Sequence, residues 1–387
     1  MVYDVIVVGL GAMGSAAVYQ AARRGAKVLG IDQFDPPHRM GSTHGESRLT
    51  RMAVGEGDEY IPLVRRTHEI WRELEAETGD RVLHDCGVYV VSPKTASLGW
   101  REDGNFAEET ANLAVKYGIE HELISAAEVR RRHPVIRLDD GSHAYFEPSG
   151  GIVDPEGAIR SQLQLGKAFG AEVRANEPVL NIDARPDGVT VTTSLGKYET
   201  GEVVVTAGAW VKRFLPVEYQ RPLTVYRQVM YWFEAEEPEH FGFDRFPMLM
   251  WIGEKQSDIL GAFPNVDGGQ KGVKLLTEQF VESCDPDEVK REVSADEIAY
   301  FAEHYAAKRL NGLTNRCLDA KACLYTMTAD SHFLIDRHPE NERVLVASPC
   351  SGHGFKHSAA IGESLAQWAL GGKSEIDMSR FSFGRFG

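Results

Sequence analysis

Residues 1–32, MVYDVIVVGLGAMGSAAVYQAARRGAKVLGID, hold the pattern that decides the fold. The stretch from Tyr3 to Val8 is rich in β-branched residues and predicts a buried strand, and the Ala-rich stretch from Ser15 to Arg24 predicts a helix. Between them lies Gly9-Leu10-Gly11-Ala12-Met13-Gly14. In such a G-x-G-x-x-G turn the first glycine makes the bend, the second lets the backbone approach a pyrophosphate, and the third lets the helix pack closely on the strand.

A second predicted strand, from Ala26 to Ile31, ends at Asp32, where dinucleotide-binding folds place a carboxylate that holds a ribose hydroxyl. An ordinary flexible turn is the alternative for the glycines alone, but two strands, a helix and an acid argue together for a dinucleotide site. A carboxylate repels a 2′-phosphate, so Asp32 disfavours NADP and leaves NAD or FAD.

The composition is that of a soluble globular protein, with 43% hydrophobic and 26% charged residues among 387, a length that suits two domains. A net charge of −15 argues against nucleic acid or an anionic membrane as partner and favours small molecules. Five cysteines without C-x-x-C pairing indicate neither a disulfide framework nor a metal site. No basic residues precede the apolar start, so we expect a cytoplasmic protein.

Strands and helices alternate along the chain, but the βαβ rhythm is interrupted. Helices are predicted at 61–78, 105–117, 126–132, 154–170 and 285–310, and strands at 82–91, 172–173, 189–192, 203–205, 226–234 and 259–263. The strand at 203–205 ends on small residues, including Gly208, which lets backbone pass close to a cofactor. We predict an α/β protein with a discontinuous Rossmann-like nucleotide domain (1–85, 150–220, 320–387) and a strand-rich α+β substrate domain (86–149, 221–319).

Four further motifs stand in order after the glycine turn: Pro36-Pro37-His38, Thr43-His44-Gly45-Glu46-Ser47-Arg48 with Arg51, Cys323-Leu324-Tyr325-Thr326, and Gly352-His353-Gly354-Phe355-Lys356. With that spacing the chain resembles, almost end to end, the monomeric sarcosine oxidase and N-methyltryptophan oxidase group of amine-oxidising flavoproteins. The resemblance implies a monomer that binds FAD and uses a small amine and oxygen.

The resemblance also implies roles for individual residues. Cys323 would be joined through sulfur to the 8α-methyl of FAD, Lys274 would promote the reaction with oxygen, Arg51 and Lys356 would bind the substrate carboxylate, His44 and Arg48 would lie near the flavin ring, and Tyr325 would line the substrate cavity. The cofactor-binding set would be Gly9, Gly11, Ala12, Met13, Gly14, Asp32, Gly41, Ser42, Arg48, Val179, Gly208, Cys323, Gly352, His353, Gly354, Phe355 and Lys356. A buried inert thiol and a surface lysine are the alternatives for Cys323 and Lys274.

The activity that the resemblance implies is oxidation of a secondary amine or N-methyl amino acid to an imine, which hydrolyses to aldehyde and amine, with release of hydrogen peroxide. Four alternatives stay open: an oxidase of a cyclic or bulky N-substituted amino acid such as pipecolate, an amine dehydrogenase using another electron acceptor, a non-catalytic flavin-binding protein, and an NAD-dependent dehydrogenase.

The sequence departs from the family at two places. An aromatic pair is replaced by Leu260 and Gly261, and a histidine four residues after the oxygen-activating lysine is replaced by Glu278. On a continued strand Lys274, Leu276 and Glu278 would share one face, so we expect Glu278 in the cavity wall beside Lys274. An acid there disfavours a second substrate carboxylate and favours a cationic or hydroxylated substrate, or it pairs with Lys274.

Overall fold

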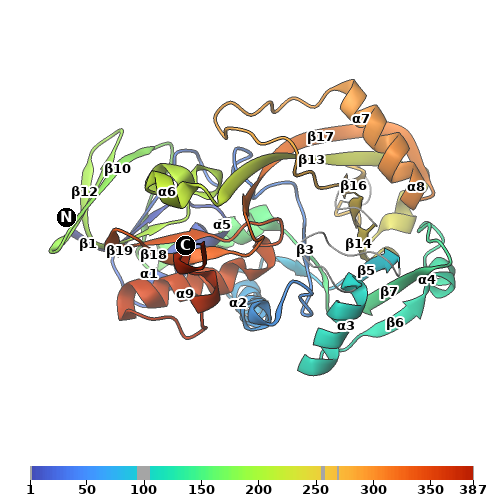
Figure 1. The fold of residues 1–387 in the computed structure, drawn as a ribbon, viewed down its shortest axis with the longest axis horizontal. Helices are drawn as coiled ribbons and strands as arrows, with labels where there is room; N and C mark the ends of the chain where they lie inside the picture. Colours follow the sequence, from blue (N-terminus) through green and yellow to red (C-terminus); the bar gives the residue numbers. More distant parts are fainter. Residues whose placement is uncertain (1, 94–104, 254–257, 268–269, 387) are drawn as a thin grey trace.

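The computed structural model describes residues 2–93, 105–253, 258–267 and 270–386. Within them the chain forms two eight-stranded sheets and one small three-stranded sheet. In Figure 1 the first large sheet lies in the left half of the molecule and the second in the right half. The amino-terminal strand lies inside the first sheet, and the last helix, α9 (Ser358–Gly371), packs beside it.

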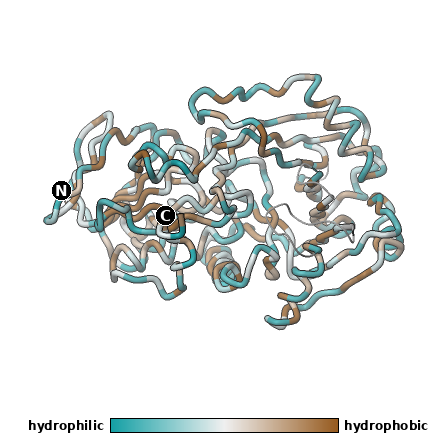
Figure 2. Tube along the Cα trace, in the orientation of Figure 1, coloured by the Kyte–Doolittle hydropathy of each residue, from teal (hydrophilic) through white to brown (hydrophobic). Residues whose placement is uncertain are grey.

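The first sheet has a parallel centre in the order β9-β2-β1-β12-β19, with β18 antiparallel at one edge and the β10–β11 hairpin paired to the start of β12. Its strands are β1 (Val2–Val8), β2 (Val28–Ile31), β9 (Glu172–Arg174), β10 (Val179–Arg185), β11 (Gly188–Thr193), β12 (Lys197–Val205), β18 (Leu334–His338) and β19 (Asn341–Ser348). The strands of this centre are apolar where both faces are covered, as in β1, β2 and the last three residues of β12, and Figure 2 shows hydrophobic segments in this region.

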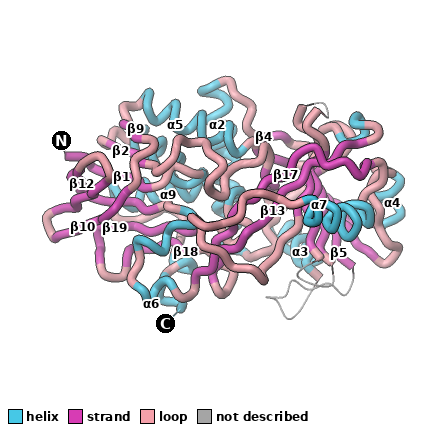
Figure 3. The backbone as a smooth tube through the Cα atoms, turned by 90° about the horizontal axis from the view of Figure 1, so that it is seen from above, coloured by secondary structure: helices cyan, strands magenta, loops and turns pink. Residues whose placement is uncertain are grey.

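The helices that cover the first sheet form a layer in which α1 (Ala12–Arg23) packs between α9 and α5 (Pro155–Ala168), and α2 (Ile61–Thr78) packs on α9 and α5. Figure 3 shows this arrangement from above, with α2 and α5 on the same side of β1 and β2. Their buried faces meet the sheet in one apolar cluster, which includes Val18, Leu63, Ile159 and Ile361. The remaining helices are α3 (Phe106–Tyr117), α4 (Ala126–Arg132), α6 (Val217–Gln220), α7 (Ala295–Phe301) and α8 (Ala307–Arg309).

The second sheet has the order β17-β13-β16-β15-β14-β5-β7-β6. Its strands are β5 (Val88–Pro93), β6 (Glu122–Ser125), β7 (Ser142–Glu147), β13 (Leu223–Ala235), β14 (Met248–Ile252), β15 (Ile259–Phe263), β16 (Val273–Leu276) and β17 (Leu313–Thr328). The small sheet, β3 (Arg48–Thr50), β8 (Gly151–Val153) and β4 (Leu83–His84), has β8 in the middle. We propose that the chain forms a nucleotide domain (1–85, 150–220, 320–387) and a substrate domain (86–149, 221–319). Strand β17 crosses the boundary between them at residue 320.

Most predicted elements are confirmed, including the helices at 61–78 and 126–132 and the strand at 259–263. The prediction of a helix at 285–310 is wrong for residues 285–294. Helix α7 begins only at Ala295, because Ser294 forms a capping box with Glu297. The preceding segment is held in an irregular path by Arg227, which donates to the carbonyls of Lys290 and Glu292. A π-helical turn at 302–306 separates α7 from α8.

One strand prediction also needs correction. The strand expected at 82–91 is two strands, β4 and β5, separated by Gly87 with φ +78°, a left-handed conformation that glycine favours. Strand β17, which was not predicted from the sequence, runs from Leu313 to Thr328 because it pairs with the long strand β13 as far as Leu223. It carries both Cys323 and Tyr325.

Gly14, the third glycine of the G-x-G-x-x-G turn, has no room for a side chain. A Cβ atom on Gly14 would lie 1.8 Å from the carbonyl oxygen of Gly9 and 2.6 Å from Oγ1 of Thr206. We expect Gly14→Ala to lower the free energy of unfolding by about 1–3 kcal/mol and to weaken FAD retention, because α1 must shift away from the strands. Chemical denaturation with measurement of bound flavin tests this. Gly371→Ala is the matched control, since no atom lies within 4 Å of its Cβ position, and an equal effect of both variants would contradict the prediction.

Candidate active site

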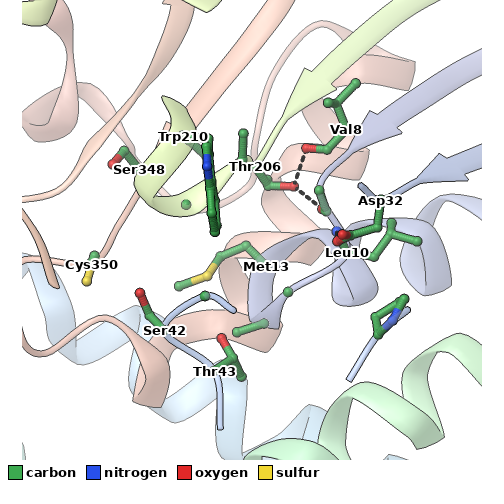
Figure 4. A pocket seen from close by; sticks show the side chains of 18 of the residues that line it. Val8, Leu10, Met13, Asp32, Ser42, Thr43, Thr206, Trp210, Ser348 and Cys350 are labelled. Atoms are coloured by element: carbon green, nitrogen blue, oxygen red, sulfur yellow. Dashed lines mark hydrogen bonds between the residues drawn. The ribbon is translucent and has the colours of Figure 1, made fainter. Parts of the chain in front are cut away.

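A pocket of about 180 Å³ opens where β1, β2 and β12 end at the glycine turn. Gly9 makes the turn with φ +90°, and its carbonyl accepts a hydrogen bond from Oγ1 of Thr206 at 2.7 Å. Oδ2 of Asp32 accepts from the backbone N–H of Leu10 at 2.7 Å, and Oδ1 accepts from that of Phe34 at 2.8 Å and lies 3.4 Å from Nε2 of His38. Oδ2 therefore keeps a lone pair for a further donor. In Figure 4 the pocket extends from Asp32 at one end to Ser42 and Cys350 at the other, with Met13 and Trp210 between them.

Most residues expected to bind the cofactor line this first pocket: Gly9, Gly11, Ala12, Met13, Asp32, Gly41, Ser42, Arg48, Val179, Gly208, Gly352, Gly354 and Phe355. Gly14 lies outside its lining, packed against the turn. The elongated shape, the glycine turn at the start of α1 and the buried carboxylate fit a dinucleotide such as FAD. Sequence reasoning missed Glu177, Trp210, Arg213 and Cys350, because no local motif marks them and only the fold brings them to the pocket.

A second cavity, of about 120 Å³, lies beside the first. Four residues, Arg48, Tyr325, Gly352 and Phe355, line both cavities and form the junction between them. Large apolar side chains make up much of the second wall: Leu49, Phe106, Met230, Met248, Met250, Ile259, Phe263, Leu276 and Phe280. The ionisable side chains in the lining are Arg48, Glu56, Glu278, Cys323, Tyr325, His353 and Lys356. An apolar cavity with a few convergent polar groups is the usual form of a small-molecule site.

Glu56, which sequence reasoning missed, organises the cations of the second cavity. Its carboxylate lies 2.8 Å from Nη2 of Arg51 and 3.3 Å from Nζ of Lys356, and these cations hold the pKa of Glu56 well below its usual range despite burial. Burial lowers the pKa of Lys356 to about 8, with Glu56 opposing the change. Arg51 is fully buried against Phe106 and lies outside the lining of both cavities, behind Glu56.

Glu278 lines the second cavity although β16 ends at Leu276, so it reaches the wall from the segment after the strand. A hydrogen bond joins it to Tyr325, and burial raises its pKa to about 7. A Cβ atom placed on Gly352 would lie 3.5 Å from Oε1 of Glu278 and 3.3 Å from the Tyr325 ring. The carboxylate of Glu278 therefore lies at the junction of the two cavities.

The structure separates Lys274 from Glu278, contrary to the expectation of a shared cavity wall. Lys274 lines neither cavity, and its Nζ donates to the carbonyl and hydroxyl oxygens of Ser47. Its ammonium lies 4.3 Å from the centre of the Phe263 ring. Burial, reinforced by the charge of Arg48, lowers the pKa of Lys274 well below its usual value. The charges of Glu156 and Glu46 oppose this effect only in part.

Cys323 lies on β17 at the edge of the second cavity, where burial raises the pKa of its thiol to about 11 and the charges of Arg48 and Lys274 oppose the increase. Arg48 donates to the carbonyls of Ser42 and Ser47. His44 lies outside the lining of both cavities, and burial lowers its pKa to about 3, which keeps the ring neutral. His332 lies outside the lining of both cavities, and its Nδ1 is 2.7 Å from the hydroxyl oxygen of Tyr60.

Together, the Rossmann-like sheet, the dinucleotide-shaped pocket and the adjoining apolar cavity define a flavin- or nicotinamide-dependent oxidoreductase. The family model "FAD dependent oxidoreductase" matches residues 4–368, and the chain belongs to this family. Monomeric sarcosine oxidase from Bacillus sp. (strain B-0618) is 39% identical over 99% of this chain and 96% of its own length. N-methyl-L-tryptophan oxidase from Yersinia pestis (strain Pestoides F) is 37% identical over 100% of both chains.

Solved structures share the fold. NikD, described as an unusual amino acid oxidase essential for nikkomycin biosynthesis, superimposes with a TM-score of 0.84 at 23% identity, covering 98% of this chain and 97% of NikD. L-proline dehydrogenase from P. horikoshii gives a TM-score of 0.78 at 19% identity, over 99% of this chain and 97% of that one. Among the described residues, the helices are all too short or too polar to cross a membrane.

Proposed function

We propose that this protein is an FAD-dependent oxidase of a secondary amine or N-methyl amino acid. The observation that carries the proposal is the junction of the two cavities, where Arg48, Tyr325, Gly352 and Phe355 belong to both walls. A substrate in the second cavity thereby has its reacting end beside the cofactor pocket. Relatives that match nearly the full length of the chain are named for oxidation of sarcosine and N-methyl-L-tryptophan.

The proposed roles follow the positions of the side chains. The glycine turn and Asp32 hold the pyrophosphate and ribose of FAD, and Cys323 bonds covalently to the flavin through sulfur. When bound, the flavin accepts a hydride from the carbon next to the amine nitrogen and passes the electrons to oxygen, which yields hydrogen peroxide. In its protonated form Lys274, held by Ser47 beside the Phe263 ring, supplies a positive charge behind the cavity wall for the reaction with oxygen.

Lys356 is the proposed anchor for the substrate carboxylate, because it is the lysine that faces the second cavity within the described residues. Arg51 supports it from behind by neutralising Glu56 at 2.8 Å. The apolar wall that includes Met230, Met250 and Ile259 receives the substituent of the amino acid. The water that hydrolyses the imine enters after oxidation, since apolar walls exclude it from the complete cavity.

Replacing Lys356 by methionine is expected to weaken binding of carboxylate ligands by about 10- to 100-fold, the effect of losing a hydrogen bond to a charged group. Spectral titration of the bound flavin with N-methyl amino acids and with their amides measures it, and only the acids are expected to lose affinity. In the wild type this affinity should also fall as the pH rises above about 8, because Lys356 then loses its proton. The exposed Lys373→Met is the control, and equal losses for acids and amides would contradict the assignment.

One second candidate substrate class has a structural basis. Gly261, one of the two positions where the family carries an aromatic pair, lines the second cavity and leaves room there for a cyclic or bulky N-substituted amino acid such as pipecolate. Leu260, the other position, lies outside the lining. We expect such compounds to exceed sarcosine in kcat/KM.

The proposal includes a monomeric protein, which gel filtration tests, and the cytoplasmic location stays a prediction.

The experiment that tests the function is an anaerobic screen for flavin bleaching. Purified protein is mixed without oxygen with sarcosine, N-methyl-L-tryptophan, pipecolate and primary amino acids, and bleaching by the N-methyl or cyclic acids is expected. Readmission of air should restore the colour and release one peroxide for each amine oxidised. Bleaching without peroxide would indicate a dehydrogenase, no bleaching by any amine would indicate a non-catalytic flavin protein, and a colourless protein that binds NAD would indicate an NAD-dependent dehydrogenase.

A further inference from the structure

The second cavity holds two carboxylates in different electrostatic situations. Glu56 is saturated by cations, with Arg51 at 2.8 Å and Lys356 at 3.3 Å. Within the described part of the chain, no cationic side chain lies within 4 Å of Glu278, whose partner is the neutral Tyr325. A carboxylate without a cation in an apolar wall binds a proton or a cationic ligand more readily than one already paired.

The position of Glu278 matters as much as its charge. Its carboxylate lies against Gly352 and Tyr325, and both of these residues line the cofactor pocket as well as the second cavity. The reacting nitrogen and carbon of a substrate must lie at this junction to reach the cofactor. Much of the remaining wall, which includes Met248, Met250 and Phe106, is apolar and suits a substituent rather than an ammonium group.

A secondary amine is protonated at neutral pH, since its pKa of about 10 resembles that of a lysine ammonium. A protonated nitrogen has no lone pair with which to stabilise the cation formed when hydride leaves the adjacent carbon, so one proton must first be removed. We propose that Glu278 is the catalytic residue that accepts this proton when the substrate binds. The N–H bond of the ammonium breaks, an O–H bond forms on the carboxylate, and the neutral amine keeps the electron pair. This step rests on the proposed amine oxidase function.

The charged and titratable groups around Glu278 make it a stronger base than an ordinary carboxylate. They are Glu56 from the loop before α2, His353 and Lys356 from the segment before α9, Tyr325 and Cys323 from β17, and Arg48 from β3. Burial and the charge of Glu56 raise the pKa of Glu278 to about 7, against the opposing effects of Tyr325 and Lys356. At pH 8 the carboxylate is ionised and ready to accept, whereas below pH 7 it is already protonated.

The test is the pH dependence of anaerobic flavin reduction by sarcosine and N-methyl-L-tryptophan, expressed as the reduction rate constant divided by the dissociation constant. In the wild type this ratio should fall tenfold per unit below about pH 7. In Glu278→Gln only the neutral amine reacts, so its ratio divided by that of the wild type should be about 0.01 at pH 8 and should rise about tenfold per unit up to pH 10. Deprotonation of Lys356 above about pH 8 weakens binding to both proteins and cancels in this quotient. Glu282→Gln, an exposed acid after the same strand, is the control and should match the wild type.

A merely structural role for Glu278 would lower the ratio by one factor at every pH, and such parallel profiles would overturn the proposal. A second measurement needs no variant. With a pH indicator in weak buffer at pH 8, binding of the protonated amine to the wild type should release no proton before the flavin bleaches, because Glu278 retains it. Release of one proton per bound amine would overturn the proposal. If no amine bleaches the wild type at any pH, the oxidase function itself fails, which is a separate outcome.

Discussion

Replacing Cys323 by alanine is expected to remove the flavin from acid-precipitated protein. In the wild type the precipitate should stay yellow and the supernatant colourless, because a carbon–sulfur bond survives unfolding whereas every non-covalent contact of the first pocket is lost. In Cys323→Ala the colour should move wholly to the supernatant. Absorbance of both fractions and fluorescence of the precipitate measure the change.

Cys350 gives this experiment a sharp control, since it is a second thiol, half-buried, whose residue lines the cofactor pocket itself. Cys350→Ala should keep the colour in the precipitate, and the opposite pattern would move the attachment point to Cys350. A wild-type supernatant that holds all the colour would contradict covalent attachment altogether. The thiolate is the reactive form of cysteine. Since burial raises the pKa of Cys323 to about 11, reconstitution of flavin-free protein should attach flavin faster at pH 9 than at pH 7.

The parts of the fold that follow local rules could be predicted from the sequence. The glycine turn carries its own conformational requirement, visible in Gly9 with φ +90°, and Asp32 stands at the end of the next strand. Helix α2 shows apolar residues at helical spacing and ends at Gly79, which adopts a left-handed cap. These signals lie within one element or its immediate neighbours.

The charges of the candidate site could not be assigned in the same way, because they depend on contacts between distant segments. Glu56 meets Lys356 from 300 positions away along the chain, so no local pattern shows that the carboxylate-binding cation is already paired. Glu278 reaches the cavity wall although the strand that was expected to carry it ends early. Lys274 lies on the predicted strand, yet Ser47 holds its ammonium outside both cavities. Side-chain direction at the end of a strand is set by tertiary packing rather than by alternation alone.

Lys274→Met is expected to slow reoxidation of the reduced enzyme by oxygen about 100- to 1,000-fold, the size of effect seen when one preorganised electrostatic group is removed. The first electron transferred to oxygen creates a negative charge, and a buried ammonium in a wall of low polarity stabilises that charge strongly. Anaerobic reduction by the amine should change little, because Lys274 does not line the substrate cavity. Stopped-flow measurement of the two half-reactions separates these effects.

Lys321 provides the matched control for this variant. Its ammonium lies 4.5 Å from the centre of the Trp232 ring, which Lys274 also approaches at 6.0 Å, but Lys321 is paired with Asp319 at 2.6 Å. A positive charge already neutralised by a carboxylate contributes little to a developing anion, so Lys321→Met should leave reoxidation near the wild-type rate. Because the pKa of Lys274 is lowered, wild-type reoxidation should also slow as rising pH removes its proton, and Lys274→Met should lack that dependence. Equal slowing of both half-reactions in Lys274→Met would refute the role in oxygen activation.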